Sequence, residues 1–215
     1  MNTVRIWFSK RGEASYISLL DLQRVMGRAI KRSGVPAWYT QGFNPHIYLT
    51  FACPLPLGQE SLVESVDFKT EEEHPDYEAW AEALRRVMPA GILVNRLCPA
   101  SRKAEEIAWS RYQVRYPAGM AARAAEQYNA LPQALVEKKS KRGVKTLDLK
   151  QYIPKIEVHP EGEQDCFELL LPAGVSFTVN PALLTGFFEK EYGLKPSDAH
   201  ILRTELLNEK KEKFE

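Results

Sequence analysis

Histidine is the side chain best suited to acid–base chemistry near neutral pH, and the chain contains four histidines. His46 follows Asn44 and Pro45 in the segment QGFNPH, in which glycine permits positive φ, proline fixes φ and asparagine favours turns. Such a rigid turn would present the imidazole in a fixed position. We therefore consider three roles for His46: holding the turn together, contacting a substrate, or acting as a general acid or base.

The other histidines and the cysteines give no comparable site. His74 and His159 lie in polar segments typical of solvated loops, and nothing near His200 suggests a role. The three cysteines are scattered, so neither a disulfide framework nor a CxxC site is predicted. The sequence also lacks HxxxH, GxxxxGK[ST] and GxGxxG, which argues against a metal site, an NTPase or a dinucleotide-dependent oxidoreductase. We expect no metal and no cofactor.

Positive charge is gathered in two segments, although the net charge of the chain is only +1. The first segment is a predicted helix that places four cations on one face: Arg24, Arg28, Lys31 and Arg32. The second is a predicted loop around a Ser-Lys-Arg-Gly turn, with Lys138, Lys139, Lys141, Arg142 and Lys145. Each could be a solvated surface. Few acidic residues accompany the helical cations, however, which favours polyanion binding.

Two further features lie close to the basic segments. Asp148 follows the second segment and could pair with Arg142 or Lys145, or contact a substrate directly. Aromatic residues that could stack on bases occur in or near the first basic region, although most of them are expected in the core: Trp7, Trp38, Tyr39, Phe43 and Tyr48.

A mixed α+β fold must position these residues. Strands are predicted at 4–9, 47–53, 62–69 and 92–97, with helices from Ser18 to Gly34 and over 76–87. The same βαββαβ order recurs with strands at 108–116, 147–158, 166–171 and 199–207 and helices at 120–131 and 181–192. We therefore predict an α+β fold of two tandem ferredoxin-like βαββαβ units with antiparallel sheets, over residues 1–100 and 101–215, with the basic loop in the second. The charged tail 208–215 is expected to be solvated.

Composition and hydropathy indicate the class of protein. The chain is 44% hydrophobic and 27% charged, which is typical of a soluble protein. No apolar run approaches the roughly 20 residues that cross a bilayer, and charges stand where a signal peptide would be apolar. We expect a cytoplasmic protein without a membrane partner.

Four stretches of the chain resemble the radical SAM-linked proteins, a bacterial family of unknown function: RIWFSKRGEASYISLLDLQRVMGRAIKRSG, QGFNPHIYLTFACPLPLG, KRGVKTLDLKQYI and HILRTEL. Members occur alone beside a radical SAM gene or fused to a radical SAM protein, commonly near ribonuclease and ribosomal protein genes. The resemblance implies a radical SAM partner and an RNA-directed role, with Lys10 among the matched positions. Because the chain lacks CxxxCxxC, the partner would carry the iron–sulfur cluster.

We therefore predict an RNA-binding accessory protein that acts with a radical SAM enzyme in the modification or processing of rRNA or tRNA. Lys10 and the two basic segments would contact RNA, and five residues would contact the substrate: Gly42, Phe43, Asn44, His46 and Asp148. Two alternatives stay open. His46 could be the general acid or base of a metal-independent endoribonuclease, with Lys145 stabilising the developing charge. Alternatively, the basic surface could dock the chain onto the radical SAM protein.

Overall fold

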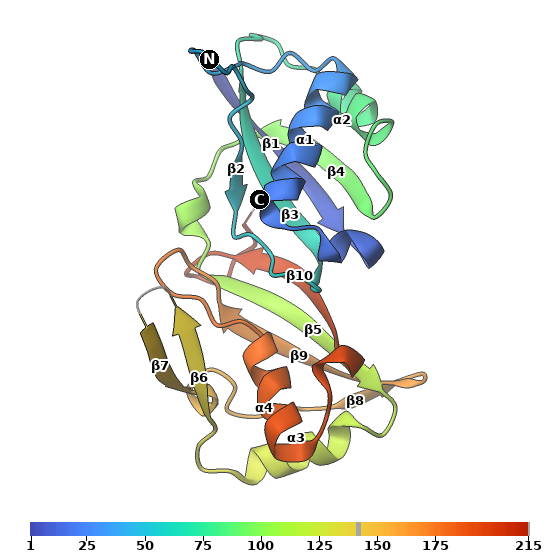
Figure 1. Cartoon of the computed structure of the whole chain (residues 1–215), viewed down its shortest axis with the longest axis vertical. Coiled ribbons are helices and arrows are strands. Elements are labelled where there is room, and N and C mark those ends of the chain that lie inside the picture. The colour runs from blue at the N-terminus through green and yellow to red at the C-terminus, as the bar shows by residue number, and fades with distance from the viewer. Residues whose placement is uncertain (141–142, 215) are drawn as a thin grey trace. The chain divides into compact units, whose positions relative to one another are not determined.

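A computed structural model describes residues 1–140 and 143–214, with the backbone alone at 139 and 140 (Figure 1). The chain divides into two units, the first comprising Met1–Ile107 and also Phe214, and the second Ala108–Lys213. Each unit combines helices with an antiparallel sheet, so the α+β class is confirmed. No helix in the described part of the chain is both long and apolar enough to cross a membrane.

The sheet of the first unit has β1 (Asn2–Lys10) at its centre. β1 pairs with β3 (Glu60–Thr70) on one side and β4 (Ile92–Pro99) on the other, and β2 (Thr50–Ala52) pairs with β3. Side chains alternate between the faces of a strand, so Val4, Ile6 and Phe8 point to one face. There they form the core with buried residues of α1 (Leu19–Ser33) and α2 (Tyr77–Arg85). Both helices therefore cover the same face of this sheet.

Helix α1 forms as its sequence predicts. The Ser18 hydroxyl accepts a hydrogen bond from the backbone N–H of Asp21 at 3.1 Å and thereby caps the first turn. Gly34 ends the helix with φ +76°, a left-handed conformation that glycine adopts without steric cost. Leu22, Met26, Ala29 and Ile30 are buried against the sheet, so the basic residues between them face outward.

The segment between α1 and β2 differs from the prediction. Only Thr50–Ala52 of the predicted strand 47–53 belongs to β2, and Ile47 instead forms an isolated antiparallel bridge with Tyr39. Cys53 has φ 48°, which is incompatible with an extended strand. β2 pairs antiparallel with β3, which includes the predicted strand 62–69.

The second unit has strands in the order β10-β5-β9-β8. These strands are β5 (Trp109–Pro117), β8 (His159–Glu161), β9 (Gln164–Pro172) and β10 (His200–Leu207). Its helices are α3 (Ala121–Ala130) and α4 (Ala182–Tyr192). Phe188 of α4 joins the layers, because its ring lies 6.1 Å from Tyr128 of α3, 6.4 Å from Tyr116 of β5 and 6.4 Å from Phe167 of β9. Short 3-10 helices complete the two units: η1 (Gly12–Tyr16), η2 (Ala104–Glu106), η3 (Leu149–Gln151) and η4 (Pro196–Asp198).

Two predictions for the second unit were wrong. The basic segment, predicted as a loop, contributes to a separate hairpin of β6 (Leu135–Ser140) and β7 (Gly143–Asp148). Only Leu147 and Asp148 of the predicted strand 147–158 are extended, at the end of β7, because Asp148 then caps η3 by accepting from the N–H of Lys150 at 3.1 Å. Pro154 then follows η3, and proline lacks the N–H that a strand ladder needs.

The tail is exposed over residues 209–213, as predicted, but Phe214 is an exception. Phe214 is 2% exposed and lies within the first unit. The guanidinium of Arg5 lies 4.9 Å from the centre of its ring, and Trp7 contacts the ring edge-on at 6.0 Å. Arg5 is itself buried, with two hydrogen bonds to the Asp67 carboxylate at 2.7 and 2.8 Å. This cluster fixes Phe214 against β1.

Candidate nucleic-acid interface

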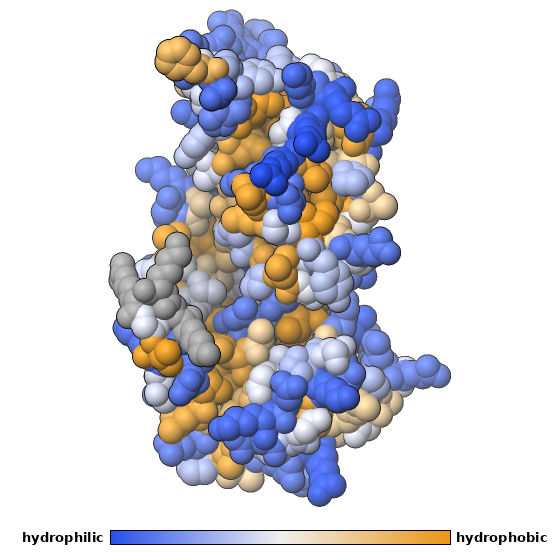
Figure 2. Space-filling view, in the orientation of Figure 1, coloured by the Kyte–Doolittle hydropathy of each residue, from blue (hydrophilic) through white to orange (hydrophobic). Residues whose placement is uncertain are grey.

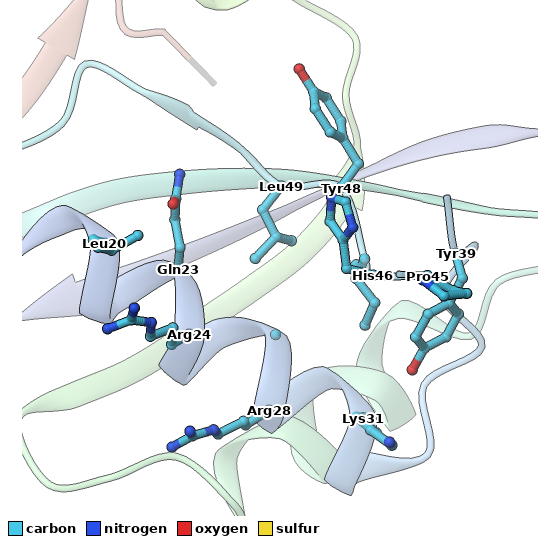
Figure 3. Close-up of a pocket in the computed structure, with 12 residues that line it drawn as sticks. Leu20, Gln23, Arg24, Arg28, Lys31, Tyr39, Pro45, His46, Tyr48 and Leu49 are labelled. Carbon is cyan, nitrogen blue, oxygen red and sulfur yellow. The ribbon is translucent and has the colours of Figure 1, made fainter. Parts of the chain in front are cut away.

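A pocket of about 500 Å³ lies in the first unit between α1 and the segment 39–49 (Figure 3). Helix α1 contributes Leu20, Gln23, Arg24, Gly27, Arg28 and Lys31. The segment contributes Tyr39, Pro45, His46, Ile47, Tyr48 and Leu49. The pocket thus combines three of the four predicted helical cations with part of the predicted turn.

The cations of α1 differ in their partners. Arg24 pairs with Asp21 at 2.9 Å, and both side chains are exposed. The hydrogen bond from Ser18, followed by that from Arg24, lowers the pKa of the Asp21 carboxyl below its ordinary value. Arg28 and Lys31 are exposed and have neither an ion pair nor a hydrogen bond from their side chains to the described residues. Arg32 is also exposed but does not line the pocket.

Gly27 leaves an open surface between these cations. It lines the pocket from the middle of α1, and a Cβ added at this position would meet no heavy atom of another part of the chain within 4 Å. Glycine in a helix interior costs about 1 kcal/mol relative to alanine. Gly27 is not among the residues predicted from the sequence, although its cost in a helical pattern marks the position.

The segment 39–49 forms the wall of the pocket opposite α1. It is a closed turn followed by residues whose side chains alternate between exposed and half-buried positions. The N–H of Thr40 donates to the carbonyl of His46 at 2.9 Å, beside the Tyr39–Ile47 bridge. Ile47 and Leu49 are half-buried and pack against the core, whereas His46 and Tyr48 are exposed. The core contacts of this segment therefore hold the wall in place next to α1.

The predicted turn residues Gly42, Phe43 and Asn44 form the tip of this closed turn. Gly42 has φ +128°, a value that L-residues rarely adopt, so glycine is required there. Phe43 is fully exposed, in contrast to the core position expected for most aromatics of this region. These three residues lie beside the pocket but do not line it. Their contact with a substrate stays a prediction.

The imidazole of His46 helps to hold the turn. Its Nδ1 lies 3.0 Å from the carbonyl oxygen of Asn44 and 3.1 Å from the hydroxyl of Thr40. Because a carbonyl oxygen can only accept, the Asn44 contact assigns the Nδ1 proton as a donor. Nε2 then has no partner within the described part of the chain. The structural role is confirmed, while substrate contact and acid–base catalysis stay predictions.

Two other predicted residues lie elsewhere. Lys10, at the end of β1, is 1% exposed, so it offers no surface ammonium group to a phosphate, contrary to its predicted role. Asp148 accepts hydrogen bonds from the N–H groups of Ala134 at 2.8 Å and Lys150 at 3.1 Å, so its carboxylate stabilises the local backbone. Its predicted contact with substrate gains no support from these bonds.

The β6–β7 hairpin carries the second set of predicted cations. Lys138 donates to the carbonyl of Thr178, and its ammonium lies 4.7 Å from the centre of the Phe177 ring. Lys145 is opposite Lys138 in the register and is exposed. Lys141 and Arg142 lie outside the described residues, as does the side chain of Lys139. Of the described cations here, Lys138 already has partners within its own unit.

The chain belongs to a family of uncharacterized proteins conserved in bacteria (DUF2344), whose sequence model matches residues 3–181. The match includes α1, the closed turn and the β6–β7 hairpin. No protein with curated function matches the chain.

Proposed function

We propose that this protein binds RNA through the pocket between α1 and the segment 39–49. The observation that carries the proposal is that Arg28 and Lys31, which have no partners among the described residues, line the same pocket as His46 and two tyrosines. RNA presents phosphates together with base faces and 2′-hydroxyls. The cations suit the phosphates, the tyrosines can stack on bases, and Nε2 of His46 can accept from a hydroxyl.

A salt titration tests this proposal. Binding of a labelled single-stranded RNA is measured by fluorescence anisotropy at increasing salt, because each phosphate contact contributes about −0.7 to the slope of log K against log salt. We expect the Arg28→Gln variant to bind more weakly and to reduce the magnitude of the slope by about 0.7. Arg123→Gln is the matched control, since Arg123 is an exposed cation on α3 that does not line the pocket. Absent or salt-independent RNA binding would contradict the proposal.

We further propose that the protein acts as an accessory subunit of a radical SAM enzyme that modifies or processes rRNA or tRNA. This part is supported by the sequence resemblance described above. Coexpression with radical SAM proteins of the same organism, followed by affinity purification with and without nuclease, tests it. Copurification that survives nuclease treatment, from a chain that does not bind RNA alone, would instead favour the docking alternative.

One observation favours a second candidate, a metal-independent endoribonuclease. The contact of Nδ1 with the Asn44 carbonyl orients the ring and leaves Nε2 able to accept a proton, as a general base must. Incubation of RNA with the wild type and with His46→Ala in EDTA separates the two functions. Cleavage that requires His46 supports the nuclease, whereas RNA binding without cleavage supports the accessory protein.

We also retain the tandem ferredoxin-like plan as a proposal about the fold. In the first unit β4, β1 and β3 are neighbours and β2 follows on β3, and in the second the order is β10-β5-β9-β8. Counting the β6–β7 hairpin as an insertion after α3, these two orders correspond element by element. This correspondence supports two βαββαβ units.

A further inference from the structure

We infer that the pocket seats a single unpaired nucleotide of the RNA, with its base inside and its phosphates at Arg28 and Lys31. The inference rests on the proposed RNA binding and specifies the class of RNA as single-stranded or looped. The inference predicts that the protein binds single-stranded RNA more tightly than duplex RNA. A general attraction to phosphates does not predict this preference.

The pocket combines a basic border with apolar lining. Leu20, Ile47 and Leu49 line it together with the three cations of α1. Figure 2 shows the same mixture, with strongly hydrophilic side chains over hydrophobic surface on the α1 side of the first unit. A surface that contacts only phosphates needs no apolar lining, whereas a nucleotide has both an apolar base face and an anionic group. The mixture therefore suits a nucleotide better than a bare phosphate backbone.

The size of the pocket also fits one nucleotide. Its volume of about 500 Å³ falls within the range of pockets that enclose one small organic molecule. In an A-form duplex the bases are paired and stacked, and the deep, narrow major groove keeps side chains away from them. A base can enter the pocket only from a single strand, a loop or a bulge.

Two tyrosines of the segment 39–49, Tyr39 and Tyr48, line the pocket and differ in the direction of their rings. Tyr39 is held by its backbone bridge to Ile47, and in the view of Figure 3 its ring is directed toward the part of α1 that carries Lys31. The Tyr48 ring points away from α1 in the same view. Tyr39 is therefore the ring that we assign to the bound base, and Lys31, which lines the same pocket, is the cation that we assign to its phosphate.

Gly27 allows a test that leaves every charge in place. The variant Gly27→Leu fills the pocket from the middle of α1, and leucine is a better helix former than glycine. We expect binding of a labelled single-stranded RNA to weaken by about tenfold, in line with the loss of one stacked base. The salt slope should stay unchanged, because the phosphate contacts remain. Gly186→Leu is the matched control, because Gly186 lines a separate hollow on α4 and a Cβ there would also meet nothing within 4 Å.

A second variant and a second RNA complete the experiment. Tyr39→Leu removes the proposed stacking ring without filling the pocket, and Tyr16→Leu, at an exposed tyrosine of η1 outside the pocket, is its control. The wild type should bind the single strand more tightly than the same sequence annealed to its complement. Equal binding of both forms, with Gly27→Leu and Tyr39→Leu unaffected, would overturn this inference while RNA binding stands. Failure of the wild type to bind either form would overturn the proposed function as well.

Discussion

The outward face of α1 and the β6–β7 hairpin are both rich in lysine and arginine, yet Lys138 of the hairpin has different surroundings from Arg28 and Lys31 of α1. On α1, Arg28 and Lys31 border a pocket and have no side-chain partners among the described residues. On the hairpin, Lys138 contacts the Thr178 carbonyl and the Phe177 ring. The number of cations in a segment therefore does not determine how many are available to a ligand.

Local sequence explains part of this difference. On α1 the apolar positions at helical spacing turn inward, so the cations between them must face outward, and the acidic residue Asp21 engages Arg24. On the hairpin, alternation sends successive side chains to opposite faces, and Lys138 meets a segment that is distant in sequence. The first arrangement follows from periodicity alone, whereas the second depends on tertiary contacts.

The largest expected difference between the two regions is in RNA affinity after charge reversal. Lys31→Glu removes a cation from the pocket and adds repulsion, so we expect RNA binding at low salt to weaken by about tenfold or more. Lys145→Glu makes the same change at an exposed position of the hairpin and should alter affinity by about twofold at most. Fluorescence anisotropy with one labelled RNA measures both variants. Equal losses would show that both regions contact RNA.

A smaller effect is expected on stability, where substitution in the hairpin should cost more than substitution on α1. Lys138→Met keeps an apolar side chain but removes the contacts with Thr178 and Phe177, and we expect a loss of about 1 kcal/mol in the free energy of unfolding. Arg28→Met, which breaks no side-chain contact within the described residues, should change stability by less than about 0.5 kcal/mol. Urea denaturation of the two variants measures the difference. A similar loss for both would show that Lys138 is no more engaged than Arg28.

The smallest expected effect is on the pH dependence of stability, through the ion pair of Arg111 with Glu205. Arg111 hydrogen-bonds to Glu205 at 2.9 Å, and this bond, with a further contribution from Lys213, lowers the pKa of the Glu205 carboxyl below its ordinary value of 4.5. A lowered pKa means that the pair stabilises the fold above about pH 4.5 and that this contribution is lost as the pH falls through the lowered pKa.

The Glu205→Gln variant tests this direction of the pH dependence. We expect it to reduce the free energy of unfolding by about 0.5 kcal/mol at neutral pH, a typical value for a partly exposed ion pair. The variant and the wild type should converge in stability as the pH is lowered below 4.5. Denaturation at several pH values measures the two curves, and a difference that grows on acidification would contradict the assignment.

Features that depend on short-range chemistry could be predicted from the sequence. The Ser18 cap, the Gly34 stop and the outward cations of α1 all follow from residues within a few turns of one another. The strand predicted over 147–158 was wrong beyond Asp148, because the Asp148 carboxylate accepts from the N–H of Lys150 and the chain turns into η3. A carboxylate that captures backbone N–H groups in this way is not visible as hydrophobic periodicity.

The candidate site could be predicted only in part, because its separate features are local but their arrangement around one pocket depends on tertiary packing. His46 and the helical cations were found as separate features, one from turn chemistry and the other from charge spacing. That they line one pocket depends on the half-buried positions of Ile47 and Leu49, which place the turn beside α1. Gly27 was missed because a glycine contributes nothing to a charge or hydrophobicity pattern, and its value lies in the space that it leaves.

The packing of Phe214 on Arg5 and Trp7 affects how the protein is made and handled. Residue 214 is synthesised after the entire second unit, so the nascent first unit lacks this part of its structure until translation has reached that codon. Deletion of Phe214 would remove the ring from the buried guanidinium of Arg5.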